Sequence, residues 1–413
     1  MADEIPPAMR EEADEGFVPG QDQRQAPDLS ASNPYPPKRR SDGRSERCEP
    51  RDAACAAQVG TPPIATPQAS PRQSFAAIDL GTNNCRLLIA RPQGENFVVI
   101  DAFSRVVRLG EGLASSGRLS DAAMDRALGA LQICADKLRR RRVHLARSVA
   151  TEACRRAANG PEFIERVREE TGIALDIISA REEARLAVLG CHILLEQGEG
   201  PAMIFDIGGG STELVLVEQG EAPLPRILDW MSVPWGVVSL TETCGTEPAD
   251  SEGRIARYAD MRRRVRDSFA PLAARLDEML RARGDGPRLR LLGTSGTVTT
   301  LASLHLELPQ YDRRAVDGLI VDAGAMRGIC ERLSTMPIPA RRELACIGRE
   351  RADLVVAGCA ILETILDLWP AGRLGVADRG IREGILRSLM ASEGMAEATR
   401  TALRRARRES LGR

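Results

Sequence analysis

A glycine-rich segment bracketed by two carboxylates is the part of this 413-residue sequence best suited to chemistry. It reads Asp206-Ile207-Gly208-Gly209-Gly210-Ser211-Thr212-Glu213 and lies between two apolar runs. Three consecutive glycines weaken a strand, but they let successive backbone N–H groups approach an anion with no side chain in the way. The Ser211 and Thr212 hydroxyls add donors. The segment therefore predicts a phosphate-binding loop, with a plain glycine hairpin as the alternative.

Asp206 and Glu213 predict a divalent cation at this loop. Two carboxylates beside a bound phosphate would repel it unless a cation lay between them. Mg²⁺ or Mn²⁺ is the expected ion, because both prefer oxygen ligands. We expect Asp206 and Glu213 to bind it together with Asp79, the acid at the matching position of an earlier segment.

The earlier segment repeats the pattern at an offset of 127 residues, which places Asp79 on Asp206. At this offset Ile78-Asp79-Leu80-Gly81 falls on Phe205-Asp206-Ile207-Gly208, and the apolar triplet 87–89 falls on 214–216. The turn Gly81-Thr82-Asn83-Asn84 is a weaker form of the same loop, and Arg86 stands where the second copy has Glu213. A guanidinium suits phosphate oxygens. Two domains of like architecture, with a ligand site in the cleft between them, explain the repeat.

Glu183 is the candidate for proton transfer. Ser179-Ala180-Arg181-Glu182 fits a capping box, so Glu182 has a structural task at the start of a helix. Glu183 is left over in the first turn, where it could take a proton from water. Acids in a first turn are also common because they favour the helix dipole, so spacing alone leaves both interpretations open.

Two further segments are candidate anion sites because each follows a strand and opens a helix. The first is Thr151-Glu152-Ala153-Cys154-Arg155-Arg156, in which Arg155 or Arg156 could add charge-assisted hydrogen bonds or simply lie on the helix surface. The second is Gly293-Thr294-Ser295-Gly296-Thr297, from which we expect Gly293, Ser295 and Gly296 to contact phosphate.

Composition excludes several other kinds of site. The sequence has only two lysines, Lys38 and Lys137, and neither follows glycine, which excludes a Walker-type P-loop. Its three histidines form neither a metal-binding HExxH helix nor a His-Asp pair. With 3% aromatic residues and a formal charge of −1, it has neither base-stacking platforms nor a general basic coat, so we expect no DNA or RNA partner.

Cysteines and apolar runs indicate a cytoplasmic protein. The ten cysteines include no CxxC pair and lie mostly in apolar stretches, as reduced core residues do. The longest apolar run, 354–362, is too short to span a bilayer, so no membrane partner is expected.

Strand and helix patterns alternate from residue 75 onward. We expect strands at 75–79, 85–90, 97–107, 144–150 and 175–178, helices at 120–142 and, broken near Gly160-Pro161, at 151–171, and a strand at 288–292 before a helix. This alternation predicts the α/β class.

We expect five segments along the chain. Residues 1–73 hold 12 of the 25 prolines without hydrophobic periodicity, which predicts a disordered tail. We expect the first domain at 74–184, the second at 185–379, a helix at 380–391 that packs back on the first, and a basic tail at 392–413.

Taken together these motifs resemble the exopolyphosphatase and guanosine pentaphosphate phosphohydrolase family, a branch of the actin-like ATPase and sugar-kinase superfamily. The resemblance runs from about residue 75 to 390. The motifs are Asp206 to Leu214, Ser179 to Arg185, Val149 to Arg155, Gly293 to Thr297 and Gly380-Ile381-Arg382-Glu383-Gly384. It implies two ribonuclease-H-like domains that flank a cleft.

The resemblance also implies roles for individual residues. Glu183 would be the catalytic base, and Asp206, Gly208 and Glu213 would form the metal and phosphate centre. Asp79 with Gly81, Thr82 and Asn83 would form the facing loop, and Arg86 and Arg155 would bind substrate phosphates. Longer members continue into a helical region with an HD-like domain. This chain stops soon after Glu383, which leaves its handling of long polyphosphate, and a homodimer, open.

The expected function is metal-dependent hydrolysis of a terminal phosphoanhydride, in inorganic polyphosphate or guanosine pentaphosphate, by water that Glu183 activates. One alternative is an ATP-dependent kinase of the same superfamily. Another is a sensor that binds polyphosphate or a guanosine alarmone without turnover.

Overall fold

Two mixed β-sheets form the framework of the chain. The computed structural model describes residues 73–94, 96–222, 224–282 and 289–394. The tail predicted at 1–73 lies outside them up to residue 72, and the basic tail predicted at 392–413 lies outside them from residue 395 onward, whereas residues 392–394 are still helical. The first sheet has the order β3-β2-β1-β4-β5, with β1 (Phe75–Leu80), β2 (Asn84–Gln93), β3 (Asn96–Val106), β4 (Leu145–Ala150) and β5 (Leu175–Ile177). The second has the order β10-β11-β9-β6-β7-β8, with β6 (Pro201–Ile207), β7 (Thr212–Glu218), β8 (Arg226–Val233), β9 (Arg290–Thr294), β10 (Ile320–Asp322) and β11 (Arg373–Ala377).

The same hairpin starts both sheets. β1 and β2 pair Asp79 with Arg86, and β6 and β7 pair Asp206 with Glu213. The two turns close through the same bond, from Gly81 N to Asn84 O and from Gly208 N to Ser211 O, each 2.9 Å long. All these positions differ by the predicted 127 residues. The α/β class with two similar halves is therefore confirmed.

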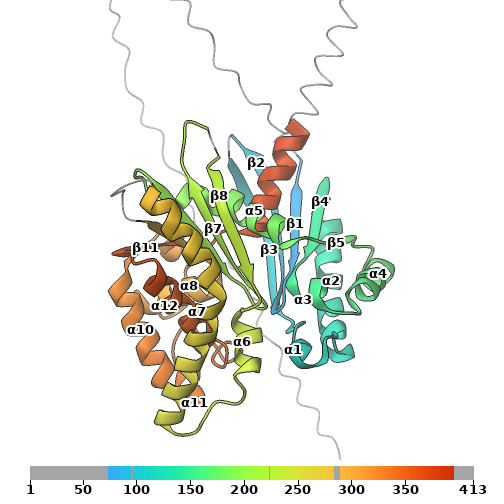
Figure 1. Cartoon of the computed structure of the whole chain (residues 1–413). Coiled ribbons are helices and arrows are strands. Elements are labelled where there is room, and N and C mark those ends of the chain that lie inside the picture. The colour runs from blue at the N-terminus through green and yellow to red at the C-terminus, as the bar shows by residue number, and fades with distance from the viewer. Residues whose placement is uncertain (1–72, 95, 223, 283–288, 395–413) are drawn as a thin grey trace, which may run out of the picture. The chain divides into compact units, whose positions relative to one another are not determined.

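Helices of the first lobe cover one face of the first sheet (Figure 1). They are α1 (Leu113–Ser116), α2 (Asp121–Arg140), α3 (Glu152–Arg156) and α4 (Gly160–Thr171). Their apolar side chains form one buried cluster with those of β1 and β2. Ser120 caps α2 as predicted, by accepting from Ala123 N, and the predicted break lies between α3 and α4.

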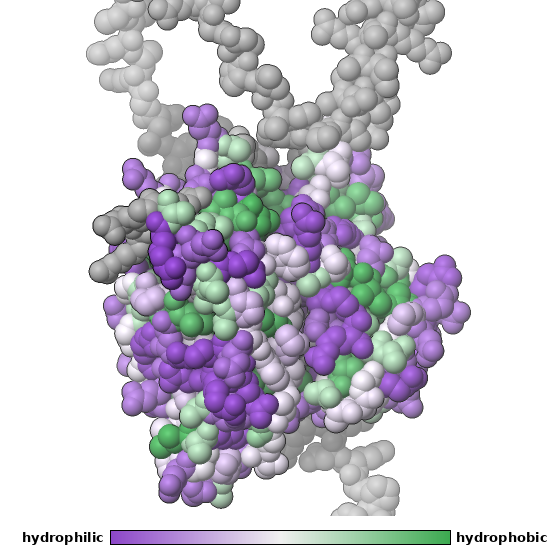
Figure 2. All heavy atoms as spheres, viewed as in Figure 1, coloured by the Kyte–Doolittle hydropathy of each residue, from purple (hydrophilic) through white to green (hydrophobic). Residues whose placement is uncertain are grey.

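The second lobe is built from the second sheet and from α6 (Val237–Thr243), α7 (Ser251–Ala282), α8 (Gly296–His305), α9 (Arg313–Val316), α10 (Ala323–Thr335), α11 (Ile338–Arg342) and α12 (Val355–Leu368). The apolar run at 354–362 begins the buried helix α12, which packs against α7. The outward side of α7 is hydrophilic (Figure 2). Within the described residues no helix is both long and apolar enough to cross a membrane.

Two helices connect the lobes and touch through glycines. α5 (Ala180–Cys191) leads through the short turn η1 (His192–Leu194) toward the second sheet, and residues 381–394 form a helix after β11. A Cβ atom on Gly190 would lie 2.0 Å from Gly380 O, and one on Gly384 would lie 2.0 Å from Leu186 O. Ile381 and Ile385 pack with Phe75 and Leu88 of the first sheet. The returning helix, red in Figure 1, therefore lies on the first lobe.

Candidate active site

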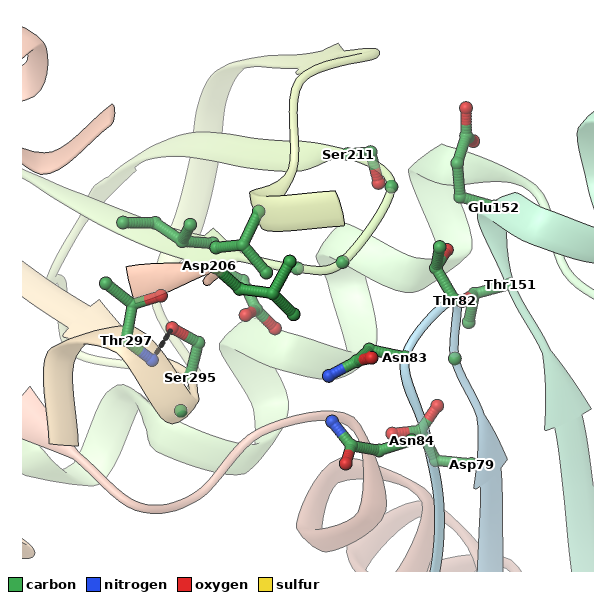
Figure 3. A pocket seen from close by; sticks show the side chains of 18 of the residues that line it. Asp79, Thr82, Asn83, Asn84, Thr151, Glu152, Asp206, Ser211, Ser295 and Thr297 are labelled. Atoms are coloured by element: carbon green, nitrogen blue, oxygen red, sulfur yellow. Dashed lines mark hydrogen bonds between the residues drawn. The ribbon is translucent and has the colours of Figure 1, made fainter. Parts of the chain in front are cut away.

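A cavity lies where the two hairpin turns meet (Figure 3). Turn residues of the first lobe line one side of it, those of the second lobe line the other, and the starts of α5 and α8 complete it. The predicted site residues in its wall are Asp79, Gly81, Thr82, Asn83, Arg86, Glu183, Asp206, Gly208, Gly209, Gly210, Ser211, Glu213, Ser295 and Gly296. Residues more than 200 positions apart in the sequence thus meet in one place.

Close approach of the turns explains two of the three glycines. A Cβ atom on Gly210 would lie 2.6 Å from Thr82 Oγ1 and 2.9 Å from Glu152 Cγ, and one on Gly209 would lie 3.1 Å from Asn83 N. Neither glycine has a positive φ, so space rather than backbone conformation requires glycine here. The predicted open glycine loop is in fact packed against the facing turn.

Backbone donors remain available at this contact. Among the described residues, none accepts a hydrogen bond from the N–H groups of Thr82, Asn83, Gly209 or Gly210. Each turn therefore contributes two N–H groups that can bind an anion, in the manner of a backbone nest.

Three residues that were predicted to bind phosphate do not line the cavity. Thr212 is buried, and its Oγ1 donates to Trp235 O at 2.6 Å. Gly293 lies in β9, where a Cβ atom would be 2.7 Å from the Phe205 ring, so close packing requires glycine. The Arg155 guanidinium is bound to two carboxylates. These three predictions are corrected accordingly.

Arg155 instead holds Glu183. Its Nη1 donates to Glu183 Oε2 at 3.1 Å and to Ile178 O at 2.7 Å, while its Nε and Nη2 donate to Glu152 Oε2. Glu183 is 7% exposed and lines the cavity. Burial, with a smaller contribution from the Glu213 charge, raises the pKa of Glu183 well above its usual range, and Arg155 opposes the shift.

Glu182, which precedes Glu183, does not line the cavity. Ser179 Oγ accepts from Glu182 N, which confirms one half of the predicted capping box. The carboxylate does not complete the box, because it accepts from Arg147 at 3.0 Å and from Arg185 at 2.7 Å. These ion pairs hold the pKa of Glu182 below its usual value.

Buried carboxylates dominate the electrostatics of the cavity. Burial raises the pKa of Asp206 to about 6, and burial together with the Asp206 charge raises that of Glu213 to about 7. Burial also raises the pKa of Asp79. Glu213 Oε1 accepts from Ser211 at 2.7 Å and from Ser232 at 2.9 Å. Burying several carboxylates in one cavity is unfavourable unless a positive charge lies nearby. The cavity is therefore suited to bind a cation.

The donor set suits a hard divalent cation, although it is not a preformed cage. In the part of the chain that the structure describes, no group of three or more His, Cys, Asp or Glu residues lies close enough to hold a metal ion, so the predicted set of Asp79, Asp206 and Glu213 is not assembled as three ligands of one ion. However, Asp206 and Glu213 supply buried carboxylate oxygens, and the buried Asn83 Oδ1 lacks a hydrogen-bond partner. Mg²⁺ commonly takes one or two carboxylates and fills its remaining positions with water and substrate phosphate. The residues therefore fit the expected ion.

Two arginines and a helix start form the cationic wall. A Cβ atom on Gly296 would lie 3.6 Å from Arg351 Nη1 and 3.8 Å from Arg86 Nη2, so both guanidiniums reach the start of α8. Neither arginine has a carboxylate partner within 4.0 Å among the described residues. Ser295, which caps α8, has a φ of 114°, a strained conformation that is common at functional sites. Two unpaired guanidiniums beside a helix N-terminus make an anion site.

Arg351 lines the cavity but was not predicted as a site residue. It lies in the segment between α11 and α12, far from the glycine loops, and no spacing or motif marks it. Glu152 was noted only as part of a helix start, and it too lines the cavity.

The model of the Ppx/GppA phosphatase family matches residues 88–393. This range is most of the chain. It includes every residue that lines the cavity except those between Asp79 and Arg86. The chain belongs to the Ppx/GppA phosphatase family.

Curated relatives agree with membership of the Ppx/GppA family. Exopolyphosphatase 2 of Mycobacterium tuberculosis is 32% identical over 329 residues, which cover 76% of this chain and 98% of that protein. A guanosine-5'-triphosphate,3'-diphosphate pyrophosphatase of Aeromonas salmonicida is 30% identical over 316 residues, and the match covers 59% of that longer protein. This Ppx/GppA protein is accordingly a phosphoric anhydride hydrolase.

Solved structures share the fold. The Aquifex aeolicus Ppx/GppA family member is 28% identical with a TM-score of 0.61, covering 78% of this chain and 98% of that one. An exopolyphosphatase-like protein is 28% identical with a TM-score of 0.67, covering 77% and 98%. The two-lobed architecture is therefore that of Ppx/GppA proteins.

Proposed function

We propose that this Ppx/GppA phosphatase removes the terminal phosphate of inorganic polyphosphate, and also of guanosine pentaphosphate, with the aid of Mg²⁺ or Mn²⁺. One observation carries the proposal. The free N–H groups of two facing turns, two unpaired arginines and several buried carboxylates line a single cavity. The names of the M. tuberculosis and A. salmonicida relatives support these two substrates.

The cationic wall holds the terminal phosphoryl group. Arg86, Arg351 and the backbone donors of the two turns would neutralise its equatorial oxygens, which carry the charge in phosphoryl transfer. Asp206 and Glu213 would hold the divalent cation, which offsets negative charge on the phosphate oxygens when bound. Positioning and neutralisation supply most of the catalysis that this reaction requires.

Glu183 would accept the proton of the attacking water. A bond then forms between the water oxygen and the terminal phosphorus, and the bridging P–O bond breaks, with its electron pair staying on the remaining chain. Burial makes the carboxylate basic, while the ion pair with Arg155 opposes this rise in pKa and orients the carboxylate. A basic carboxylate held in a fixed orientation is suited to accept a proton from water.

Phosphate release from three substrates on one preparation tests the proposal. Long polyphosphate, tripolyphosphate and guanosine pentaphosphate are each incubated with Mg²⁺ and, as a control, with EDTA. We expect orthophosphate from at least one substrate with Mg²⁺ and a large loss with EDTA. Binding without release under any divalent cation would instead favour a sensor. Phosphorylation of an acceptor by ATP, with polyphosphate intact, would favour a kinase.

A further inference from the structure

A second groove adjoins the cavity on one side. It shares Asn84 and Arg351 with the cavity and is also lined by Ser104, Arg105 and Arg349. One wall is the end of β2 and β3 in the first lobe, and the other is the segment before α12 in the second lobe. Arg108 Nη2 joins these walls by donating to Glu350 O at 3.3 Å. The groove therefore leads outward between the lobes from the cationic wall.

The lining of this groove is basic. Three arginines, Arg105, Arg349 and Arg351, face a single acid, Glu350. Neither Arg105 nor Arg349 has a carboxylate within 4.0 Å among the described residues. Arg105 and Arg349 are exposed, and the Arg105 guanidinium carbon lies 5.6 Å from the Phe103 ring centroid. Unpaired arginines that continue from a phosphate site attract further phosphates.

A second space adjoins the cavity beside Thr82 and Gly210, and it is far narrower. There the adjoining space is only about 10 Å³, against about 440 Å³ for the basic groove, and is lined by Glu152, Glu242 and Arg156. Glu242 Oε1 accepts from Gly112 N at 2.9 Å, which joins the lobes on that side. A volume of 10 Å³ scarcely holds one water molecule. A polyphosphate chain therefore has no room to leave the cavity through this space.

We propose that the groove lined by Arg105, Arg349 and Arg351 binds the part of a polyphosphate chain behind its reacting end. This inference rests on the proposed function, because it needs the terminal phosphate in the cavity. Arg351, shared by both spaces, would contact the chain as it leaves, and Arg349 and Arg105 would contact phosphates farther along. A substrate of a few phosphates would not reach them.

Kinetics as a function of chain length test the groove. The double variant Arg105→Gln/Arg349→Gln is compared with Arg140→Gln/Arg332→Gln, which removes one exposed arginine from each lobe away from the groove. We expect the KM for long polyphosphate to rise about tenfold in the groove variant, as loss of two modest charge contacts implies. The KM for tripolyphosphate and kcat should stay unchanged, as should all values in the control.

Several results would overturn the inference. An equal rise for tripolyphosphate would place the arginines at the reacting end, an equal rise in the control would mean a general charge effect, and no rise would leave the groove without a role. A rise for guanosine pentaphosphate alone would assign the groove to the nucleotide.

Direct binding of labelled long polyphosphate separates this inference from the hydrolase proposal. If the wild type releases no orthophosphate from any substrate, the proposed function fails, but the groove variant should still bind the chain about tenfold more weakly than the control. Equal binding by the groove variant and the control would contradict the groove itself. Matching melting temperatures exclude a folding defect as the cause of weaker binding.

Discussion

Two adjacent glutamates illustrate how residue environment separates structural from chemical roles. Glu182 and Glu183 differ by one position, yet Glu182 forms ion pairs outside the cavity and Glu183 lies buried in its wall. A 100° step around α5 directs one toward solvent and the other toward the cleft. The two residues therefore form a natural matched pair for mutagenesis.

Glu183→Gln should lower kcat for orthophosphate release by about 10² to 10⁴, the usual contribution of a positioned base. The amide keeps the size of the side chain but cannot take a proton. Glu182→Gln should leave kcat within about threefold, since only partly exposed ion pairs outside the cavity weaken. Steady-state phosphate release measures both. Equal rates in the wild type and Glu183→Gln would remove Glu183 from the mechanism.

The buried acids make stability dependent on pH. With metal absent, the folded chain holds protons on Glu213 and Asp206 up to about pH 7 and 6, whereas the unfolded chain releases them near pH 4.5 and 3.8. The folded state thus binds more protons in this window, so its free energy of unfolding should fall as pH rises from about 4 to 7.

Denaturant unfolding in EDTA at several pH values measures this slope. Glu213→Gln should flatten it, because the amide does not titrate. If Glu213→Gln keeps the full wild-type slope, Glu213 is not the group that makes the free energy of unfolding depend on pH.

At the scale of elements, contact between the two hairpin turns determines the site. Gly210→Ala would press a methyl group against Thr82 and Glu152, which are both buried. We expect it to lower the free energy of unfolding by about 1–3 kcal/mol, as overpacking does, and to reduce kcat/KM by moving the turns apart.

Gly129→Ala in α2 is the matched control. A Cβ atom there meets no atom within 4 Å, and alanine favours a helix over glycine by about 0.5–1 kcal/mol. It should therefore stabilise the chain without affecting activity. If both variants change stability in the same direction, the contact between the turns is not tight.

The hairpins could be predicted because strand pairing is local. Asp79 pairs with Arg86 and Asp206 pairs with Glu213 in the two hairpins. The same offset of 127 residues relates both pairs, so the register of one hairpin predicts that of the other. The role of the glycines was only partly predictable, because it depends on a turn in the other lobe. For Arg155 the position at a helix start was predicted, but its ion pairs were not: Glu152 lies three residues earlier in α3, and Glu183 comes from the later helix α5.

At the scale of the whole molecule, the described cavity is built from the two lobes. Among the residues that the structure describes, those that line it all lie between Asp79 and Ile381. Removal of residues 1–72 should therefore leave kcat and KM within about twofold, because no group that contacts substrate is lost. Phosphate release from the shortened and full chains measures this. A tenfold loss would show that the removed segment contributes to the site.

The complete lining of the cavity could not be predicted from the sequence. Two glycine loops and one helix start were predictable from local patterns, whereas Arg351 and the basic groove depend on how the segment before α12 packs across the first lobe. No local pattern encodes such a long-range contact, which arises only when both lobes are folded.

The fate of water oxygen tests the central claim most directly. Long polyphosphate is hydrolysed with Mg²⁺ in water enriched in ¹⁸O, and the products are analysed by mass spectrometry. Attack by Glu183-activated water on the terminal phosphorus predicts one solvent ¹⁸O in each released orthophosphate and none in the remaining chain. Label in the remaining chain, or orthophosphate without solvent oxygen, would contradict the account.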